Sequence, residues 1–365
     1  MADATPLVLV MAGGTGGHVY PALAVATELR DRGYRIAWVG TSRGLESRVV
    51  PAAGITLHHL PMRGVRGKNL LHKALGVVML MVALVQALVL VYRLAPRCVI
   101  GLGGYAAGPA GLAAWLLRKP LVIHEQNAVA GTTNRLLAPM AKTVVAGFPG
   151  AFREDINYEV LGNPVRRELL AAAVAHPWDF DGQRPLRLLI VGGSLGAKPL
   201  NDLVPGVVRK LLKSDEGPGL EVWHQSGAAH GDAVRSAYGR AADGPVKITE
   251  FIEDMAGAYG WADLVLCRAG ALTVAELAIM GRPALLVPLP HAIDDHQTAN
   301  ARALTDRGAG IMLKQSELNA SRLHDILQSY LSRPERLAIM AAAARDAAHP
   351  DATRDVADRC EEFLA

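Results

Sequence analysis

The sequence has 365 residues, 51% hydrophobic and 20% charged, which excludes a disordered chain and favours two domains over a single core. Its net charge of +4 suits an anionic ligand or a membrane surface but is too small to indicate binding to nucleic acid. Three widely spaced cysteines without a CxxC pair fit a reducing cytosol and offer no metal site, and no signal peptide is expected.

Strand and helix candidates alternate along the first 150 residues. The expected strands are 7–11, 35–39, 55–60, 98–102, 121–124 and 143–147, and the expected helices are 20–30, 70–94, 108–117 and 132–137. Because strands that are apolar on both faces belong to parallel sheets covered by helices, this pattern predicts a doubly wound α/β domain. The loops after the strands then lie along one edge of the sheet, where such domains bind ligands.

The pattern breaks near Gly162-Asn163-Pro164 and restarts after a polar stretch that ends at Pro185. The second set of strands is 186–191, 221–224, 246–252, 264–267, 284–287 and 310–313, and a helix over 200–213 follows the first of them. We therefore expect two Rossmann-like domains facing across a cleft, over residues 1–163 and 164–340, with the helices of 341–365 packing back toward the first. The Asp179-Phe180-Asp181 pair in the polar stretch is interpreted as a turn.

A glycine-rich loop from Met11 to His18 follows the first strand. Its four glycines let the backbone approach a ligand closely, and the helix that it opens favours an anion at its N-terminus. His18 places a proton acceptor beside that anion. The alternative is a tight strand-to-helix turn capped by the histidine. Val19 stands where GxGxxG needs its third glycine, and no Walker motif is present, so neither NAD nor a P-loop nucleotide is indicated.

The loops after the second set of strands carry candidate donor-binding residues. Residues 192–197 form another glycine-rich loop, and residues 267–276 end a strand and begin a helix. Arg268 and Glu276 fit a diphosphate and sugar hydroxyls at that helix start, although Thr273 and Glu276 also have the spacing of a capping box. The 251–255 loop suits the edge of a base or an ordinary strand end, and the 291–297 loop suits a sugar because its two histidines lack zinc spacing.

Residues 74–92 form an apolar stretch whose only strongly polar member is Gln86. A membrane-spanning helix is rejected because it would split the first sheet, and a helix buried against the sheet is the alternative interpretation. We favour docking on an anionic phospholipid surface, because cations flank the stretch on both sides. These cations are Arg63, Arg66, Lys68, Lys73 and Arg93.

Seven motifs together resemble the MurG family, the bacterial UDP-N-acetylglucosamine:lipid I N-acetylglucosaminyltransferases of glycosyltransferase family 28. They are Gly13 to His18, Gly103-Gly104-Tyr105, His124 to Asn127, Gly162 to Arg166, Gly192-Gly193-Ser194, Phe251 to Met255 and Gly270 to Glu276. The resemblance implies a GT-B fold without cofactor or metal. It also implies inverting transfer of GlcNAc from UDP-GlcNAc to the C4 hydroxyl of MurNAc in lipid I, giving lipid II at the cytoplasmic face of the inner membrane.

The resemblance also assigns roles to residues. His18 is the expected general base and Glu125 its rival, and the acceptor diphosphate is expected near Gly13, Gly14, Gly104 and Tyr105. The residues expected to bind UDP-GlcNAc are Thr15, Gly16, Gly17, Asn127, Arg166, Ser194, Ile252, Arg268, Ala271, Leu272, Thr273, Val274, Ala275, Glu276 and Gln297. Leu195 departs from the glutamine common in the family, and His296 competes with Gln297 for the sugar.

Two other functions remain open from the sequence. A UDP-GlcNAc 2-epimerase would pair two similar domains around the same nucleotide sugar, but it would need neither the apolar stretch nor a lipid. A nucleotide-sugar sensor on the membrane would bind UDP-GlcNAc without consuming it.

Overall fold

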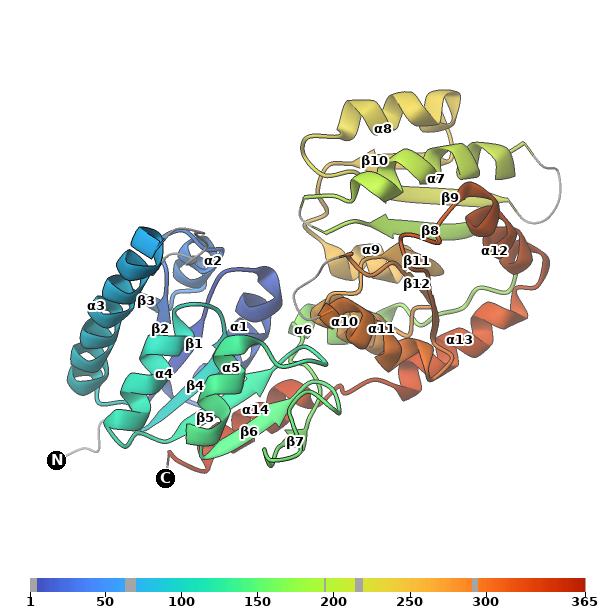
Figure 1. The fold of residues 1–365 in the computed structure, drawn as a ribbon. Coiled ribbons are helices and arrows are strands. Elements are labelled where there is room, and N and C mark those ends of the chain that lie inside the picture. Colours follow the sequence, from blue (N-terminus) through green and yellow to red (C-terminus); the bar gives the residue numbers. More distant parts are fainter. Residues whose placement is uncertain (1–4, 63–69, 194, 214–218, 291–294, 365) are drawn as a thin grey trace. The chain divides into compact units, whose positions relative to one another are not determined.

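The computed structural model describes residues 5–62, 70–193, 195–213, 219–290 and 295–364. The chain divides into two compact units (Figure 1). The first consists of Met1–Arg166 with Pro350–Ala365, and the second consists of Arg167–His349. The boundary therefore falls three residues after the expected one, and of the last two helices α13 (Glu335–Asp346) lies in the second unit and α14 (Ala352–Glu361) in the first.

The first unit is built on a seven-stranded sheet in the order β3-β2-β1-β4-β5-β6-β7, with every pair parallel. Its strands are β1 (Leu7–Ala12), β2 (Arg35–Gly40), β3 (Thr56–His59), β4 (Cys98–Gly103), β5 (Leu121–Glu125), β6 (Thr143–Ala146) and β7 (Glu159–Val160). The first six strands were predicted from the alternating apolar runs. The two-residue β7 was not, because both of its residues are exposed at the sheet edge.

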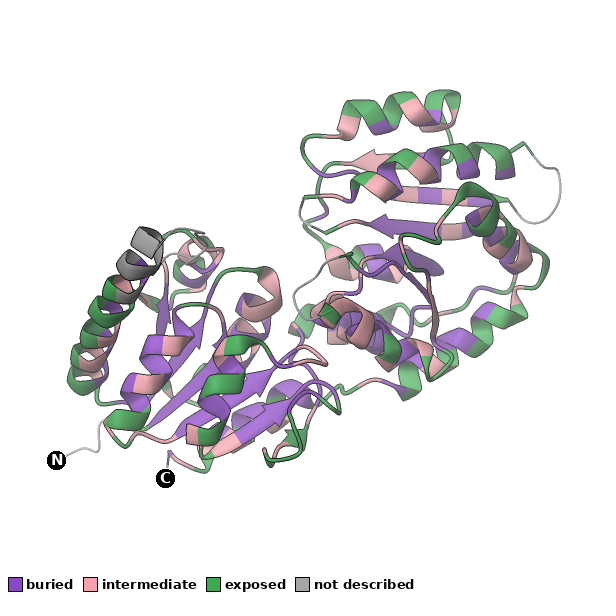
Figure 2. Ribbon diagram, viewed as in Figure 1, coloured by how far each residue is buried: buried purple, intermediate pink, exposed green. Residues whose placement is uncertain are grey.

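Helices cover both faces of this sheet. One face packs against α3 (Leu70–Leu94), α4 (Ala107–Leu116) and α5 (Thr132–Leu137), and the other against α1 (Gly16–Asp31), α2 (Glu46–Ala52) and α14. Successive β1 residues alternate between the two cores, with Leu9 in one and Val10 in the other. The central strands of both units are mostly buried (Figure 2). The doubly wound fold predicted for this half is confirmed, although α1 begins at Gly16 rather than at residue 20.

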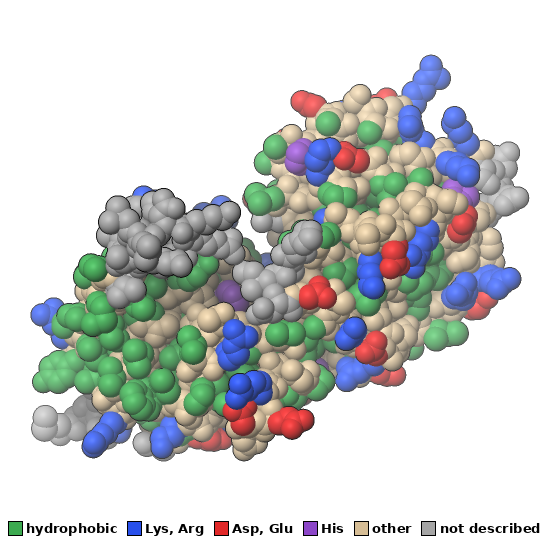
Figure 3. Space-filling model, viewed as in Figure 1, with side chains coloured by type: hydrophobic (Ala, Val, Ile, Leu, Met, Phe, Trp, Pro, Cys, Tyr) green, Lys and Arg blue, Asp and Glu red, His purple; other side chains and the backbone are tan. Residues whose placement is uncertain are grey.

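The α3 helix is apolar all round but has only one buried side. Ala83, Ala87 and Val91 recur at helical spacing and lie in the core. Seven large apolar side chains of α3 are exposed, namely Val78, Leu80, Met81, Val82, Val85, Val89 and Tyr92, and all but Leu80 lie on the opposite side. Hydrophobic side chains gather over this helix in Figure 3. Among the described residues no helix is long and apolar enough to cross a membrane.

The second unit repeats the design with a six-stranded parallel sheet in the order β10-β9-β8-β11-β12-β13. Its strands are β8 (Leu186–Val191), β9 (Leu220–Gln225), β10 (Val246–Thr249), β11 (Leu264–Cys267), β12 (Ala284–Leu286) and β13 (Gly310–Met312). Its other helices are α6 (Arg167–Ala175), α7 (Lys198–Leu211), α8 (Gly231–Tyr238), α9 (Met255–Trp261), α10 (Ala271–Met280), α11 (His296–Thr305) and α12 (Ala320–Ser332). All six predicted strands are present, but β10 ends at Thr249, so Ile252 lies in the loop after it.

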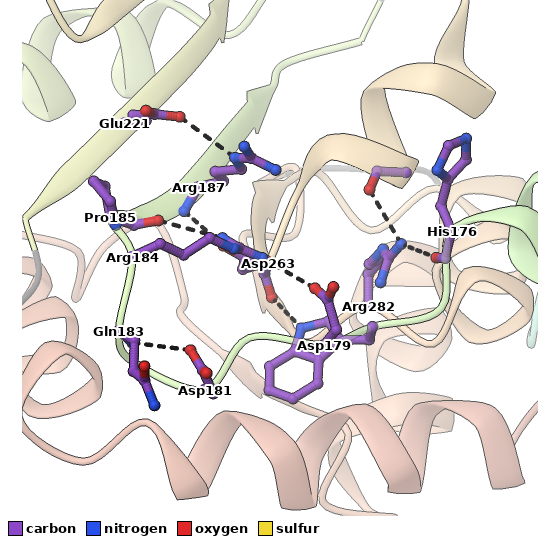
Figure 4. Close-up of polar contacts among 12 residues, drawn as sticks. His176, Asp179, Asp181, Gln183, Arg184, Pro185, Arg187, Glu221, Asp263 and Arg282 are labelled. Atoms are coloured by element: carbon purple, nitrogen blue, oxygen red, sulfur yellow. Dashed lines mark hydrogen bonds and ion pairs between the residues drawn. The ribbon is translucent and has the colours of Figure 1, made fainter.

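The polar stretch that ends at Pro185, before β8, is hydrogen-bonded to the second unit (Figure 4). Arg184 makes paired hydrogen bonds of 2.6 and 2.8 Å to the buried carboxylate of Asp263. Asp179 also accepts from Arg184, and Asp181 accepts from the Gln183 amide, so the two aspartates serve a turn and an ion pair. The stretch is therefore a packed part of this unit.

Candidate functional site

The first glycine-rich loop is held against the end of β4 by close backbone packing. Gly104 has a φ of +90°, and a Cβ there would collide with the backbone of Gly13. Gly103 lies against the ring of His18 in the same way. The structure therefore brings Gly13, Gly104 and His18, which lie up to 91 positions apart in the sequence, to one edge of the sheet.

His18 lies in the first turn of α1 rather than at the end of a loop. Because α1 starts at Gly16, the expected anion-binding amides of Gly16 and Gly17 belong to the helix start itself. Thr15 is the residue before the helix, and its carbonyl accepts from the amides of His18 and Val19. The imidazole Nδ1 lies 2.7 Å from Oε1 of Gln126, and the side chain is partly exposed.

Glu125, the rival base, is buried and fully engaged by its own loop. It accepts hydrogen bonds from the backbone and side-chain nitrogens of Asn127, the amide of Gly131 and the side chain of Asn134, at 2.8–3.0 Å. Only 1% of Glu125 is exposed. This geometry makes Glu125 the organiser of the loop that carries Asn127, and it favours His18 as the proton acceptor.

Glu46 is a buried carboxylate that the sequence did not reveal as part of the site. It accepts hydrogen bonds from the amide of Gly14 at 2.9 Å and from the amide and hydroxyl of Thr41 at 2.8 Å. Burial alone would raise its pKa, but these hydrogen bonds outweigh it and hold the pKa of Glu46 below its usual range. The Gly14 amide is therefore already used, and the expected anion site must rely on other donors.

Two further expected residues of the first unit lie near α1 or the β4 loop. The guanidinium of Arg166 stacks over the ring of Tyr20, 5.1 Å from its centroid. The ring of Tyr20 lies beside Gly16, where a Cβ would be 3.1 Å from it. Tyr105 is 52% exposed next to Gly104. Arg166 therefore lies close to the start of α1, and Tyr105 is exposed beside the glycine pair that packs on the first glycine-rich loop.

The second glycine-rich loop is packed against the turn after β9. A Cβ on Gly196 would collide with the carbonyl of Ser226, and one on Gly227 with the carbonyl of Leu195. Leu195 itself is 85% exposed. Ser194, an expected donor contact, lies outside the described residues.

The start of α10 presents more open amides than the start of α7. In α7 the Leu200 and Asn201 amides both donate to Ala197, and Pro199 has no N–H. In α10 the first helical bond runs from Val274 to Gly270, so the amides of residues 271–273 point out of the helix end. The N-cap is Gly270 and no side chain caps the helix, so the capping-box interpretation of Thr273 and Glu276 is wrong.

Glu276 faces the interior of the second unit on α10. It is 6% exposed, and its carboxylate accepts from the hydroxyl of Tyr259 at 3.1 Å. Ile252, expected at the base, is likewise buried in the loop after β10. Of the other expected donor contacts in this helix, Ala271 and Val274 are buried, whereas Leu272, Thr273 and Ala275 are partly exposed.

Arg268 and Gln297 join the loops after β11 and β12. Arg268 donates to the carbonyls of Val287 and Pro288 and, at 2.8 Å, to the side chain of Gln315, and all three of these acceptors are neutral. Burial lowers the pKa of Arg268. The Gln297 oxygen accepts from the amides of Ala269 and Leu289. Residues 291–294 of the sugar-binding candidate loop lie outside the described residues.

No group of three or more His, Cys, Asp or Glu side chains in the described parts of the chain could hold a metal ion. The three cysteines, Cys98, Cys267 and Cys360, are buried and free.

Comparison with known proteins gives matches along nearly the whole chain. Residues 8–146 match the glycosyltransferase family 28 N-terminal domain, and residues 187–356 match the glycosyltransferase family 28 C-terminal domain. The chain is similar to curated proteins named UDP-N-acetylglucosamine–N-acetylmuramyl-(pentapeptide) pyrophosphoryl-undecaprenol N-acetylglucosamine transferase. That of Alkalilimnicola ehrlichii is 52% identical and that of Stutzerimonas stutzeri 50%, each over 97% of this chain and 98% of the relative.

Solved structures agree with these matches. MurG of Acinetobacter baumannii is 40% identical with a TM-score of 0.83, covering 98% of this chain and 99% of that one. A UDP-GlcNAc 2-epimerase from Neisseria meningitidis reaches a TM-score of 0.68 at 14% identity, over 98% and 99% of the two chains, which is a likeness of fold alone. The predicted GT-B fold is confirmed, and the chain belongs to the MurG family within glycosyltransferase family 28.

Proposed function

We propose that this chain transfers GlcNAc from UDP-GlcNAc to the C4 hydroxyl of MurNAc in lipid I, producing lipid II. The observation that carries the proposal is the 50–52% identity, over nearly the full length of both partners, to transferases named for this reaction. The first unit receives the lipid-linked acceptor and the second binds the nucleotide sugar.

The second unit supplies the stabilisation of the leaving group. As the bond between C1 of GlcNAc and the phosphate oxygen breaks, negative charge develops on UDP. The open amides at the start of α10 and the cation of Arg268 follow the same strand, β11, and are suited to that charge. Electrostatic stabilisation of this kind is usually the largest single contribution to catalysis.

The first unit supplies the base. A bond forms between the C4 oxygen of MurNAc and C1 of GlcNAc, and the hydroxyl proton passes to the imidazole of His18. Gly103 lies against that imidazole, and the amides of Gly16 and Gly17 at the start of α1, with Gly13 and Gly104 packed together beside them, are suited to the acceptor diphosphate. A general base contributes roughly 10²–10⁴-fold to such a reaction.

A direct assay tests this function. The protein is incubated with radiolabelled UDP-GlcNAc and a lipid I analogue, with and without EDTA, beside a reaction that lacks the lipid. We expect label in a disaccharide lipid, only when both substrates are present and whether or not EDTA is added. Formation of N-acetylmannosamine without acceptor would instead indicate an epimerase, and binding without consumption would indicate a sensor.

The exposed side of α3 is part of the same proposal and docks the protein on the cytoplasmic surface of the bacterial inner membrane. Its exposed apolar side chains can enter the boundary between headgroups and acyl chains. Trp115 and Leu116 on α4, which packs against α3, add exposed apolar surface, and Arg93 and Arg118 are exposed cations at the ends of these two helices. The predicted cations Arg63, Arg66 and Lys68 lie outside the described residues, and of Lys73 only the backbone is described.

Vesicle flotation tests the docking side. The double variant Met81→Glu/Val85→Glu should float poorly with phosphatidylglycerol vesicles yet keep its turnover of a short-chain, water-soluble lipid I analogue. Ile339→Glu is the matched control, because Ile339 is 68% exposed on α13, in the other unit. Equal flotation of the double variant and the control would contradict docking through α3.

A further inference from the structure

The imidazole of His18 ends a row of hydrogen bonds that starts in the interior of the first unit. The row joins the Gly162 carbonyl to His124 at 3.0 Å, His124 to Gln126 at 2.9 Å, and Gln126 to His18 at 2.7 Å. We propose that Gln126 is a positioning residue that holds His18 in the tautomer whose Nε2 accepts the proton. The inference rests on the proposed role of His18 as general base.

Which atom donates in each hydrogen bond of this row is fixed at the inner end, where His124 is completely buried. A carbonyl oxygen can only accept, so Nε2 of His124, which faces the Gly162 carbonyl, must carry the proton. Burial lowers the pKa of His124 to about 4, so the ring is neutral near pH 7. Its Nδ1 therefore has a lone pair and can only accept.

The buried His124 fixes the orientation of the Gln126 amide, which in turn fixes the atom that Gln126 presents to His18. Its Nε2 donates both to Nδ1 of His124 and, at 3.1 Å, to the backbone carbonyl of His124. Two acceptors require the amide nitrogen on this side, so the amide oxygen must face His18. Gln126 is 1% exposed, so a reversed amide would face these two acceptors with its oxygen and would find no water to replace the lost hydrogen bonds.

His18 is then left with one arrangement in its neutral form. Oε1 of Gln126 can only accept, so Nδ1 of His18 carries the proton and the lone pair lies on Nε2. The ring is also held in place by Gly103, because a Cβ at that position would lie 3.0 Å from both Nδ1 and Cε1. The atom that remains for a substrate hydroxyl is Nε2, on the ring edge away from Gln126.

The neighbouring carboxylate of Glu125 takes no part in this row. Successive side chains of a strand point to opposite faces, so Glu125 points away from His124 and Gln126 and bonds to Gly131 and Asn134. His18 is thus oriented by a neutral amide. A carboxylate in that place would add negative charge beside the expected acceptor diphosphate, whereas an amide fixes the tautomer without repelling it.

Nitrogen NMR of the histidine-labelled protein tests the assignment directly, with His18→Gln identifying the signal. In the native protein at neutral pH we expect neutral His18 to be protonated on Nδ1. In Gln126→Leu the ring should move toward the Nε2–H tautomer that a free imidazole in water prefers. A native spectrum with the proton on Nε2 would overturn the proposal without any variant, and so would an unchanged tautomer in Gln126→Leu.

Kinetics provide a second test that a merely structural role would not pass. Gln126→Leu should lower kcat about tenfold or more, within the ~10²–10⁴-fold that a general base supplies, while the KM for UDP-GlcNAc changes little. In a His18→Ala background the same substitution should cost nothing further, because Gln126 acts through His18. Losses that multiply in the double variant would contradict this.

The two tests separate this inference from the proposed function. If the protein fails to transfer GlcNAc, the tautomer measured by NMR still decides whether Gln126 orients His18. If transfer proceeds but the native ring is protonated on Nε2, the function stands and the positioning role falls.

Discussion

The two units have the same architecture and both pack glycine backbones closely at the loop-bearing edges of their sheets, but the side chains that join their loops differ in charge. In the first unit, buried polar side chains tie the loops to one another, through Glu46, Glu125 and Gln126. In the second, amide side chains and a cation do so, because Gln225 donates to the carbonyl of Gly193 and Gln297 and Arg268 join the loops after β11 and β12.

This difference matches the two halves of the proposed reaction. A proton acceptor must have a fixed tautomer and position, which a network of oriented hydrogen bonds provides in the first unit. A leaving diphosphate needs open donors and positive charge, which the start of α10 and Arg268, bonded to neutral acceptors, provide in the second. The same fold can therefore serve proton transfer in one copy and anion stabilisation in the other.

In the second unit the largest effect is expected at Arg268. Arg268→Ala should lower kcat about 10²–10³-fold, as removal of one electrostatic donor does in other enzymes, and should weaken UDP binding. Arg268→Lys, which keeps the charge but loses the paired geometry, should fall between Arg268→Ala and the native protein. Steady-state kinetics and calorimetric titration with UDP measure both effects. An unchanged kcat in Arg268→Ala would show that Arg268 does not stabilise the leaving diphosphate.

A smaller effect, on stability, is expected in both units from one buried histidine each. Burial lowers the pKa of His124 in β5 and of His224 in β9 to about 4, against 6.5 in an unfolded chain. Between these values the unfolded state binds more protons, so stability is lost as the pH falls from about 6.5 toward 4, by up to about 3 kcal/mol for each histidine.

Thermal melts at pH 7.5 and pH 5.0 measure this loss. His224→Gln keeps a donor and an acceptor for Asn201 and Tyr238 but cannot titrate, so its melting temperature should depend less on pH. If native protein and variant respond equally to acid, burial of these rings does not govern acid sensitivity.

The smallest effect is expected at Glu46, the buried carboxylate that joins loops at the edge of the sheet in the first unit. Glu46→Gln replaces one carboxylate oxygen by an NH₂ donor, which then faces the amide of either Gly14 or Thr41, and it should cost about 1–3 kcal/mol of stability. Because the pKa of Glu46 is held below its unfolded value of 4.5, its contribution is present above that pH and is lost as the pH falls through the lower, folded value. Denaturant titrations at pH 7 and pH 4 compare the two proteins, and equal stability at pH 7 would refute the role of Glu46.

Much of the fold was predictable because strand signals in buried parallel sheets are strong and local. Twelve of the thirteen strands in the described residues coincide with apolar runs, and two helices of the second unit, α7 and α10, follow glycine-containing loops. The exceptions are also instructive. Exposed β7 has no apolar signal, and α2 is a short helix of seven residues with only two buried side chains.

The roles within the site were less predictable, because they depend on which partner each polar atom finds. Glu125 and Gln126 are adjacent in one motif, yet strand alternation sends the first to its own loop and the second to His18. Thr273 and Glu276 have capping-box spacing, but the helix starts at Ala271 and leaves the box unused. The one feature of the sequence that could have indicated a buried Glu46 is weak. Gly40 and Gly44 precede it, and a Cβ at either position would collide with its side chain.

The most direct test of the account compares two substitutions at the edge of the first unit, assayed with UDP-GlcNAc and a lipid I analogue at saturation. His18→Ala should lower kcat by about 10²–10⁴-fold with donor binding preserved, whereas Glu125→Gln should act mainly on stability and retain more of the turnover. Near-native turnover in His18→Ala together with an inactive but folded Glu125→Gln would reverse the roles and contradict the account.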